Sequence, residues 1–139
     1  MNTAIIVDTG ALYGIADESD SWHKRIKSFL DGNRASLIVP VTVLPEACYL
    51  LNTYLGVQAE QELLMSSVQG EIKIENIAKE DMHRIVELLI CFNDANIGFV
   101  DASIVAIAER LKISHVLTTD RRHFSLFRPH HCASFTLLP

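Results

Sequence analysis

The feature of this sequence that most constrains its fold is the alternation of short apolar runs with longer segments of helical periodicity. Residues 4–7 form an almost uninterrupted apolar run, which is typical of a strand buried on both faces of a sheet. Further strands are predicted at 37–39, 72–74, 115–118 and 134–137. Strands that exchange regularly with helices indicate crossover connections, and therefore a parallel sheet covered by helices on both faces.

Helices are predicted between these strands, where apolar residues recur every three or four positions. Their predicted ranges are 11–16, 21–30, 42–54, 58–68, 79–91 and 101–111. The pattern predicts an α/β fold, a three-layer α/β/α sandwich, in a single domain over residues 1–139. Ligands of such folds bind beyond the carboxyl ends of the strands. Polar residues directly after strands are therefore candidates for the functional site.

The composition narrows the class of protein. A net charge of −5 disfavours a protein that coats nucleic acid, since such binding depends on Lys and Arg. It is compatible with an enzyme whose acids gather in one pocket. Three widely spaced cysteines indicate buried free thiols in a reducing compartment. Residues 1–7 lack the features of a signal peptide, and no apolar run approaches the roughly 20 residues that span a membrane. We expect a cytoplasmic, soluble protein.

Four acidic residues stand out by position. Asp8 directly follows the first predicted strand, and Asp120 follows the strand at 115–118. Glu46 and Asp101 lie on, or at the margin of, the apolar stripes of their helices. An ionised carboxylate facing a core is costly unless something compensates its charge. All four are therefore predicted near one edge of the sheet.

Each acid also has a purely structural explanation. Asp8, Asp101 and Asp120 could cap the helices that follow them, and Glu46 could lie in a first turn, where the helix dipole favours it. Four acids at one edge would nevertheless repel each other without a cation. Hard oxygen ligands of this kind suit Mg²⁺ or Mn²⁺.

Four segments, in this order, resemble a known family. They are IVDTGAL at 6–12, Pro45-Glu46 at the start of a helix, DASIVA at 101–106 and LTTDRRHF at 117–124. The motifs are short individually, but their order and spacing are similar to those of PIN-domain proteins. The layout most resembles the VapC-type ribonuclease toxins of toxin–antitoxin pairs, over nearly the whole chain.

The resemblance implies a Rossmann-like sandwich with about five parallel strands. It implies that the four acids form the metal-binding and catalytic pocket: Asp8, Glu46, Asp101 and Asp120. Thr118 corresponds to a small hydroxyl near that pocket, where it could orient a water or a carboxylate, and Thr9 is assigned a similar supporting part. The resemblance also implies an RNA substrate, a homodimer and an antitoxin protein that blocks the pocket.

The implied chemistry is hydrolysis of RNA phosphodiester bonds. One or two divalent ions, about 3.5 to 4 Å apart if two, would activate a water and stabilise the leaving oxygen. Arg121 and Arg122 follow Asp120 and are the candidates for phosphate contacts, although exposed arginines are common on any surface. Asp94 has a position where the family often has an acid, but a turn role is the favoured interpretation.

Three alternatives stay open at this point. A phosphatase with an Asp nucleophile, of the haloacid-dehalogenase kind, would explain Asp8, but such enzymes need a second Asp where this chain has Gly10. A non-catalytic module could use the acids as an ion site. A PIN-domain nuclease could also act in RNA processing outside any toxin pair.

Overall fold

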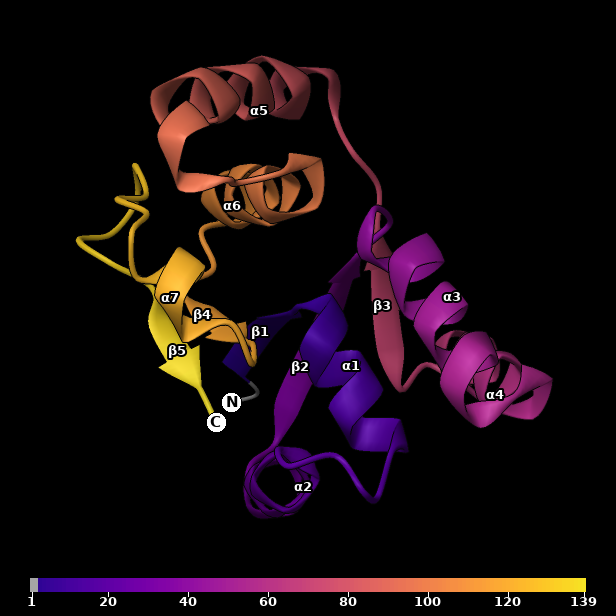
Figure 1. The fold of residues 1–139 in the computed structure, drawn as a ribbon. Coiled ribbons are helices and arrows are strands. Elements are labelled where there is room, and N and C mark those ends of the chain that lie inside the picture. The colour runs from indigo at the N-terminus through magenta and orange to yellow at the C-terminus, as the bar shows by residue number, and fades with distance from the viewer. Residues whose placement is uncertain (1–2) are drawn as a thin grey trace.

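The computed structural model describes residues 3–139 and has a five-stranded sheet at its centre (Figure 1). The strands are β1 (Thr3–Val7), β2 (Ala35–Pro40), β3 (Ile72–Glu75), β4 (His115–Leu117) and β5 (Thr136–Leu138). They lie in the order β3-β2-β1-β4-β5, and every pairing is parallel. The predicted parallel α/β sandwich is confirmed.

The order of the strands creates a switch point beside β1. The chain moves outward from β1 through β2 to β3, then crosses back and places β4 on the other side of β1. The register pairs Ile5 with His115 and Val7 with Leu117. Because β1 and β4 end level with each other, the residues that follow them emerge side by side. Open α/β sheets bind their ligands at such a point.

Helices cover both faces of this sheet. Helices α5 (Lys79–Cys91) and α6 (Phe99–Leu111) are stacked on one side, and α1 (Thr9–Ala16) and α2 (His23–Gly32) lie on the other (Figure 1). Helices α3 (Val43–Leu55) and α4 (Val57–Val68) pack against each other near β3. Two shorter helical segments complete the chain: η1 (Asn93–Ala95) and α7 (Arg121–Phe124).

Several predicted boundaries differ from the structure by one or two residues, and two of these differences have a local cause. Helix α2 starts two residues later than predicted, because the Asp20 side chain accepts a hydrogen bond from the Trp22 N–H (2.8 Å) and holds a turn there. Strand β5 starts at Thr136 rather than at 134, since Phe135 turns into the core, where it is buried, before pairing begins. Both differences are local and leave the topology unchanged.

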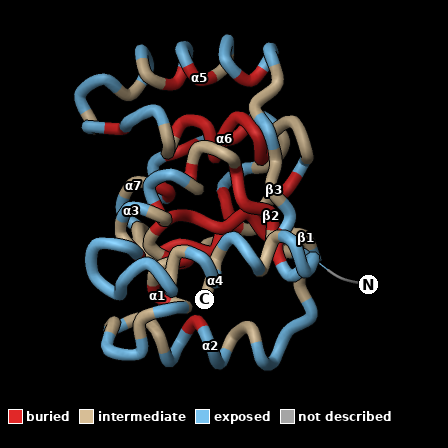
Figure 2. The backbone as a smooth tube through the Cα atoms, turned by 90° about the vertical axis from the view of Figure 1, so that its right-hand side faces the viewer, coloured by how far each residue is buried: buried red, intermediate tan, exposed pale blue. Residues whose placement is uncertain are grey.

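The core lies where β1, β4 and α6 meet (Figure 2). The side chains of Ile5, Ile6 and Val7 are almost fully buried, as expected for a strand covered on both faces. Residues 102–108 of α6 are all buried, because α6 is enclosed between the sheet and α5. Each large apolar side chain buried in this way stabilises the fold by about 1.5 to 3 kcal/mol.

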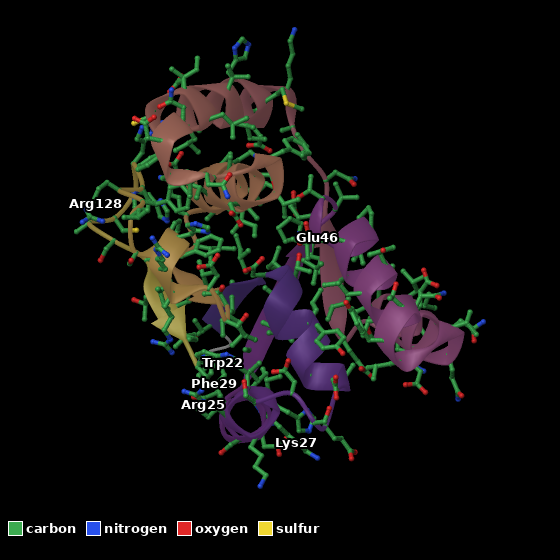
Figure 3. All side chains as sticks on the ribbon, viewed as in Figure 1. Trp22, Arg25, Lys27, Phe29, Glu46 and Arg128 are labelled. Carbon is green, nitrogen blue, oxygen red and sulfur yellow. The ribbon has the colours of Figure 1, made fainter. Side chains whose placement is uncertain are left out.

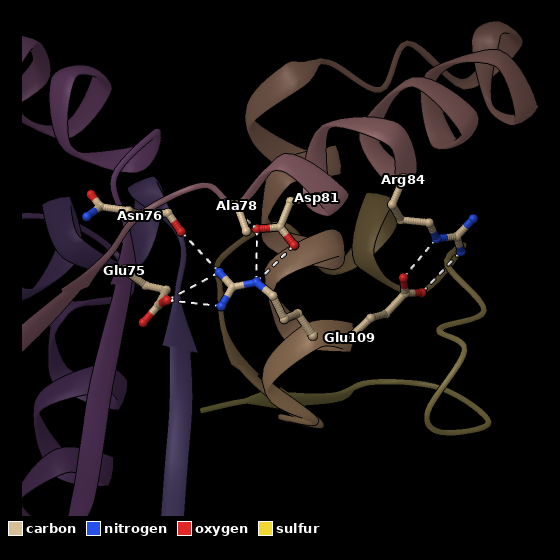
Figure 4. A network of polar contacts seen from close by, with 7 residues as sticks. Glu75, Asn76, Ala78, Asp81, Arg84 and Glu109 are labelled. Atoms are coloured by element: carbon tan, nitrogen blue, oxygen red, sulfur yellow. Dashed lines mark hydrogen bonds and ion pairs between the residues drawn. The ribbon is translucent and has the colours of Figure 1, made fainter.

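Ion pairs of Arg110 join α6 to α5 and to the end of β3 (Figure 4). The Arg110 guanidinium donates to both carboxylate oxygens of the buried Asp81 (3.0 Å each), to Glu75 (3.2 Å) and to the carbonyl of Asn76 (3.0 Å). Asp81 also accepts from the N–H of Ala78 (2.8 Å), which satisfies a donor at the start of α5. These contacts fix the position of the two helices over the sheet.

The cysteines are free, as predicted, but the prediction that they are buried is wrong. Cys91 is exposed, and Cys48 and Cys132 are partly buried. Cys91 lies at the end of α5, which packs mainly against α6. Among residues 3–139, no helix is both long and apolar enough to cross a lipid bilayer.

Candidate metal centre and active site

Asp8 lies at the switch point, directly after β1. Its carboxylate is buried, with 7% of the residue exposed. One oxygen accepts from the Thr9 N–H (2.7 Å) and caps α1, and the other accepts from the Thr118 hydroxyl (2.9 Å). The same Thr118 oxygen accepts from the Asp120 N–H (2.9 Å). Thr118 therefore connects the residues that follow β1 and β4, and it contacts a carboxylate as anticipated.

Asp120 caps the short helix α7. One of its carboxylate oxygens accepts from the His123 N–H (3.0 Å), and the other accepts from the His123 ring Nδ1 (2.8 Å). Asp101, from the first turn of α6, brings its Oδ2 to 3.9 Å from the same ring nitrogen. One potential ligand atom from each of Asp101, Asp120 and His123 lies within 4.8 Å of the others.

The electrostatics of these carboxylates reflect their crowding. Burial raises the pKa of Asp8 to about 6, the hydrogen bonds from Thr118 and Thr9 oppose the rise, and the charges of Asp101 and Asp120 add to it. Burial also raises the pKa of Asp101, and the charges of Asp120 and Glu46 act in the same direction. The charge of Asp120 thus disfavours the ionised forms of both Asp8 and Asp101, and a cation between these carboxylates would reverse the effect.

Glu46 is the outermost member of the group. It lies in the first turn of α3 and is exposed, so it belongs to the margin of that helix's apolar face (Figure 3). Its charge contributes to the raised pKa of Asp101. It is not among the three residues whose ligand atoms lie within 4.8 Å of one another. That set consists of Asp101, Asp120 and His123, and Asp8 is outside it as well. Asp8 is linked to the group through the Thr118 hydrogen bonds and through the effect of Asp101 and Asp120 on its pKa, whereas Glu46 lies at the rim.

The residues present suit a divalent cation. The donors are mostly carboxylate oxygens, the ligands that Mg²⁺ and Mn²⁺ favour. Beside Asp8, the hydroxyl of Thr9 is buried and has no hydrogen-bond partner among residues 3–139. A buried polar atom of this kind ordinarily has an ordered water as its partner. Carboxylates, hydroxyls and room for water are the usual contents of such a site.

The two predicted phosphate-binding arginines differ in their surroundings. The Arg121 guanidinium donates to the carbonyl oxygen of Pro139 (2.5 Å) and lies 5.6 Å from the centre of the Trp22 ring. Arg25 covers the same ring at 3.9 Å, and both Trp22 and Arg25 are labelled in Figure 3. Arg122 is exposed. Part of the hydrogen-bonding capacity of Arg121 is thus already used within the protein.

Three other sequence interpretations can be compared with the structure. Asp8 and Asp120 do cap helices, which confirms the structural explanation of these two acids. Asp101 does not, because Gly98 occupies the cap of α6. Asp94 lies exposed in η1, in agreement with a turn role.

His123 was missed by sequence reasoning, although its spacing from Asp120 is a usable signal. The third residue after a helix cap points its N–H back at the cap, so a histidine there brings its ring to the same carboxylate. The cavity of about 460 Å³ among Leu12, Leu51 and Leu63 is lined by none of the four candidate acids. We assign the chemistry to the switch point, where the titratable groups converge.

Comparisons with known proteins agree with this fold. The PIN domain family model matches residues 5–127. The chain is similar to ribonuclease VapC26 of Mycobacterium tuberculosis, with 32% identity over 135 residues that cover 97% of this chain and 100% of the relative.

Two solved structures share the fold at 20% sequence identity. One is VapC20 of Mycobacterium tuberculosis, a toxin that cleaves the sarcin-ricin loop, with a TM-score of 0.74 over 81% of this chain and 86% of that one. The other is a toxin–antitoxin complex from Klebsiella pneumoniae, with a TM-score of 0.68 over 88% of this chain and 92% of that one. The extent of the family match and of the curated relative leads to one conclusion: this chain belongs to the PIN-domain family.

Proposed function

We propose that this chain is a divalent-metal-dependent ribonuclease and the toxin of a toxin–antitoxin pair. The observation that carries the proposal is the convergence of Asp8, Asp101 and Asp120 at the switch point, with the raised pKa values of Asp8 and Asp101. The similarity to ribonuclease VapC26 supports RNA as the substrate. The whole of residues 1–139 would then act as one nuclease domain.

In this proposal the three aspartates hold Mg²⁺ or Mn²⁺, with Glu46 as a further ligand, directly or through water. The bound ion supplies an activated water and charge stabilisation at the phosphate. Thr118 keeps the Asp8 carboxylate in one orientation by donating to it. Thr9 offers a hydroxyl beside Asp8 that can hold a water. No histidine base is required for the chemistry.

Arg122 and Arg121 are proposed to bind phosphates of the RNA. Both follow Asp120 directly, so a phosphodiester at the acids comes within reach of arginines on the same turn. Both arginines are exposed, and Arg122 is the stronger candidate because Arg121 already donates to Pro139. Arginine suits this task since its planar group matches two phosphate oxygens.

Exposed apolar residues on α3 and α4 support a protein partner. Tyr54 and Val68 are 68% and 78% exposed, and α4 has no buried residue. Exposed apolar side chains that gather on one pair of helices are a common feature of interaction sites. The fold relative solved as a toxin–antitoxin complex favours an antitoxin as that partner. A homodimer and a cytoplasmic location remain predictions.

The proposal is tested by RNA cleavage in Mg²⁺ or Mn²⁺, compared with cleavage in EDTA. Wild type and Asp94→Asn, which changes an exposed acid outside the pocket, should cleave RNA only with metal. Asp101→Asn should lose at least about 100-fold in rate, since a ligand that positions the attacking group commonly contributes that much. Cleavage in EDTA, or full activity in Asp101→Asn, would refute the mechanism.

The same preparations distinguish the alternatives. Hydrolysis of small phosphate esters without cleavage of RNA would favour the phosphatase. Metal binding without any hydrolysis would favour the ion-binding module. Cleavage of RNA that is unaffected by every candidate small partner encoded next to this chain would favour a nuclease outside a toxin pair.

A further inference from the structure

We infer that His123 is a nitrogen ligand of the metal centre and gives it a preference for Mn²⁺ over Mg²⁺. The inference rests on the proposed metal-dependent function and adds a residue that the four predicted acids do not include. His123 lies on α7 and reaches back toward the carboxylates of both Asp101 and Asp120.

The distances suit a shared ion. Around a six-coordinate cation with bonds of about 2.1 Å, adjacent donors are about 3.0 Å apart and opposite donors about 4.2 Å apart. His123 Nδ1 is 2.8 Å from an Asp120 oxygen and 3.9 Å from Asp101 Oδ2. The three donor atoms all lie within 4.8 Å of one another. They can therefore surround one cation with only small side-chain movements.

The protein also holds the ring in place. The His123 N–H donates to one oxygen of Asp120 and the ring to the other, so backbone and side chain act on the same carboxylate. The ring is only 27% exposed, and the next residue, Phe124, is fully buried against Phe127 with ring centres 5.7 Å apart. The position of α7 is fixed by this packing, which presents the imidazole to the acids.

The chemistry of the donors determines the selectivity. Mg²⁺ and Mn²⁺ both favour carboxylate oxygen, but Mg²⁺ takes oxygen ligands almost exclusively. Mn²⁺ is a first-row transition-metal ion, and the divalent ions of that series also bind sites with nitrogen donors. In the ligated form the ring proton sits on Nε2 and the lone pair of Nδ1 faces the ion. A site with one nitrogen and several carboxylate oxygens therefore binds Mn²⁺ more tightly than Mg²⁺. A site with the acids alone would lack this basis for discrimination.

The competing explanation is that His123 only orients Asp120 through their hydrogen bond. Loss of such an outer partner can itself lower metal affinity by about 10- to 100-fold, so affinity alone does not separate the two roles. The variant His123→Asn does, because its amide can still donate to Asp120 but supplies no nitrogen ligand. His83→Asn is the matched control, since His83 is exposed on α5.

The test is pulsed electron paramagnetic resonance of Mn²⁺ bound to the purified protein. We expect ¹⁴N hyperfine coupling from a directly bound imidazole in wild type and in His83→Asn, and none in His123→Asn. Titration calorimetry should give wild type at least a tenfold lower Kd for Mn²⁺ than for Mg²⁺. His123→Asn should reduce that ratio to about threefold or less.

The outcomes separate this inference from the proposed function. Mn²⁺ that binds to wild type without ¹⁴N coupling would refute the ligand role and leave the acidic metal centre intact. A Kd ratio that is the same in wild type and His123→Asn would refute the selectivity. If neither ion binds to wild type at all, both the inference and the metal-dependent mechanism fail.

Discussion

Replacing Asp8 by asparagine should make the metal-free protein more stable at neutral pH and less stable in acid. Asp8 is buried, and its pKa is raised from 3.8 to about 6 in the folded state. The folded protein therefore binds the Asp8 proton more tightly than the unfolded chain does. A shift of about two units corresponds to about 3 kcal/mol of free energy of unfolding.

The sign of the effect follows from that shift. Below pH 4 the carboxyl is protonated in both states, and its contribution to stability is fully present. Between pH 4 and 6 the unfolded chain loses the proton first, so stability falls as the pH rises. Above about pH 6 the ionised group lowers the free energy of unfolding by the whole amount, about 3 kcal/mol.

The amide of the Asp8→Asn variant carries no charge at any of these pH values, but it has one acceptor oxygen instead of two. In wild type the two oxygens accept from Thr9 and Thr118. Loss of one of these hydrogen bonds costs about 1 kcal/mol. The variant should thus be about 2 kcal/mol more stable than wild type at pH 7.5 and about 1 kcal/mol less stable at pH 4.

Urea denaturation in EDTA between pH 4 and 8 measures this difference directly. Asp94→Asn should show no such crossing, because Asp94 is exposed. The m-value should stay the same in all three proteins if only the native state is affected. A stability difference between wild type and Asp8→Asn that does not change with pH would refute the reasoning.

Three further predictions concern the site and its support. Mn²⁺ at 100 times its Kd at pH 7.5 should raise the free energy of unfolding of wild type at that pH by about 2.7 kcal/mol. The same Mn²⁺ concentration should give a smaller rise at pH 5, where Asp8 is protonated. An equal rise at both pH values in thermal melts would contradict the role of Asp8. Thr118→Val should destabilise the metal-free protein by about 2 kcal/mol, because two buried partners lose their hydrogen bonds, whereas Thr136→Val on the exposed side of β5 should change little in urea. Asp81→Ala should lower the free energy of unfolding by about 3 kcal/mol, since it leaves the partly buried Arg110 guanidinium with fewer partners. Glu87→Ala changes a side chain that is 64% exposed and should lower it by less than about 1 kcal/mol. Equal losses in urea denaturation would show that burial does not govern these pairs.

The sequence was sufficient for the architecture because its periodicities are long and strong. In residues 101–111, apolar side chains recur at helical spacing over three turns. The structure has this helix with two more residues at its start. Asp120 is recognised in the sequence as a possible helix cap, but no range is predicted for the four-residue helix α7, since one turn is too short to display a period. It forms because Asp120 caps it and Phe124 anchors it in the core.

The sequence predicts that the aspartates converge and that Thr118 contacts a carboxylate, but it does not predict the other contacts of the candidate site. Asp8 and Asp120 follow strands, and the strand order brings adjacent strand ends together. The hydroxyl link through Thr118 and the ring of His123 depend on how the turn after β4 folds. Such turns are set by hydrogen bonds between particular side chains and the backbone, and these leave no repeating pattern in the sequence.

The exposed position of Glu46 on α3 has a consequence for how the pocket responds to its surroundings. Asp8, Asp101 and Asp120 are anchored to β1, α6 and the end of β4, which share the buried core. Glu46 is carried instead by a helix that packs on α1 and on the largely exposed α4. Of the four carboxylates, Glu46 is therefore the one that a molecule bound to the α3–α4 pair would reach first.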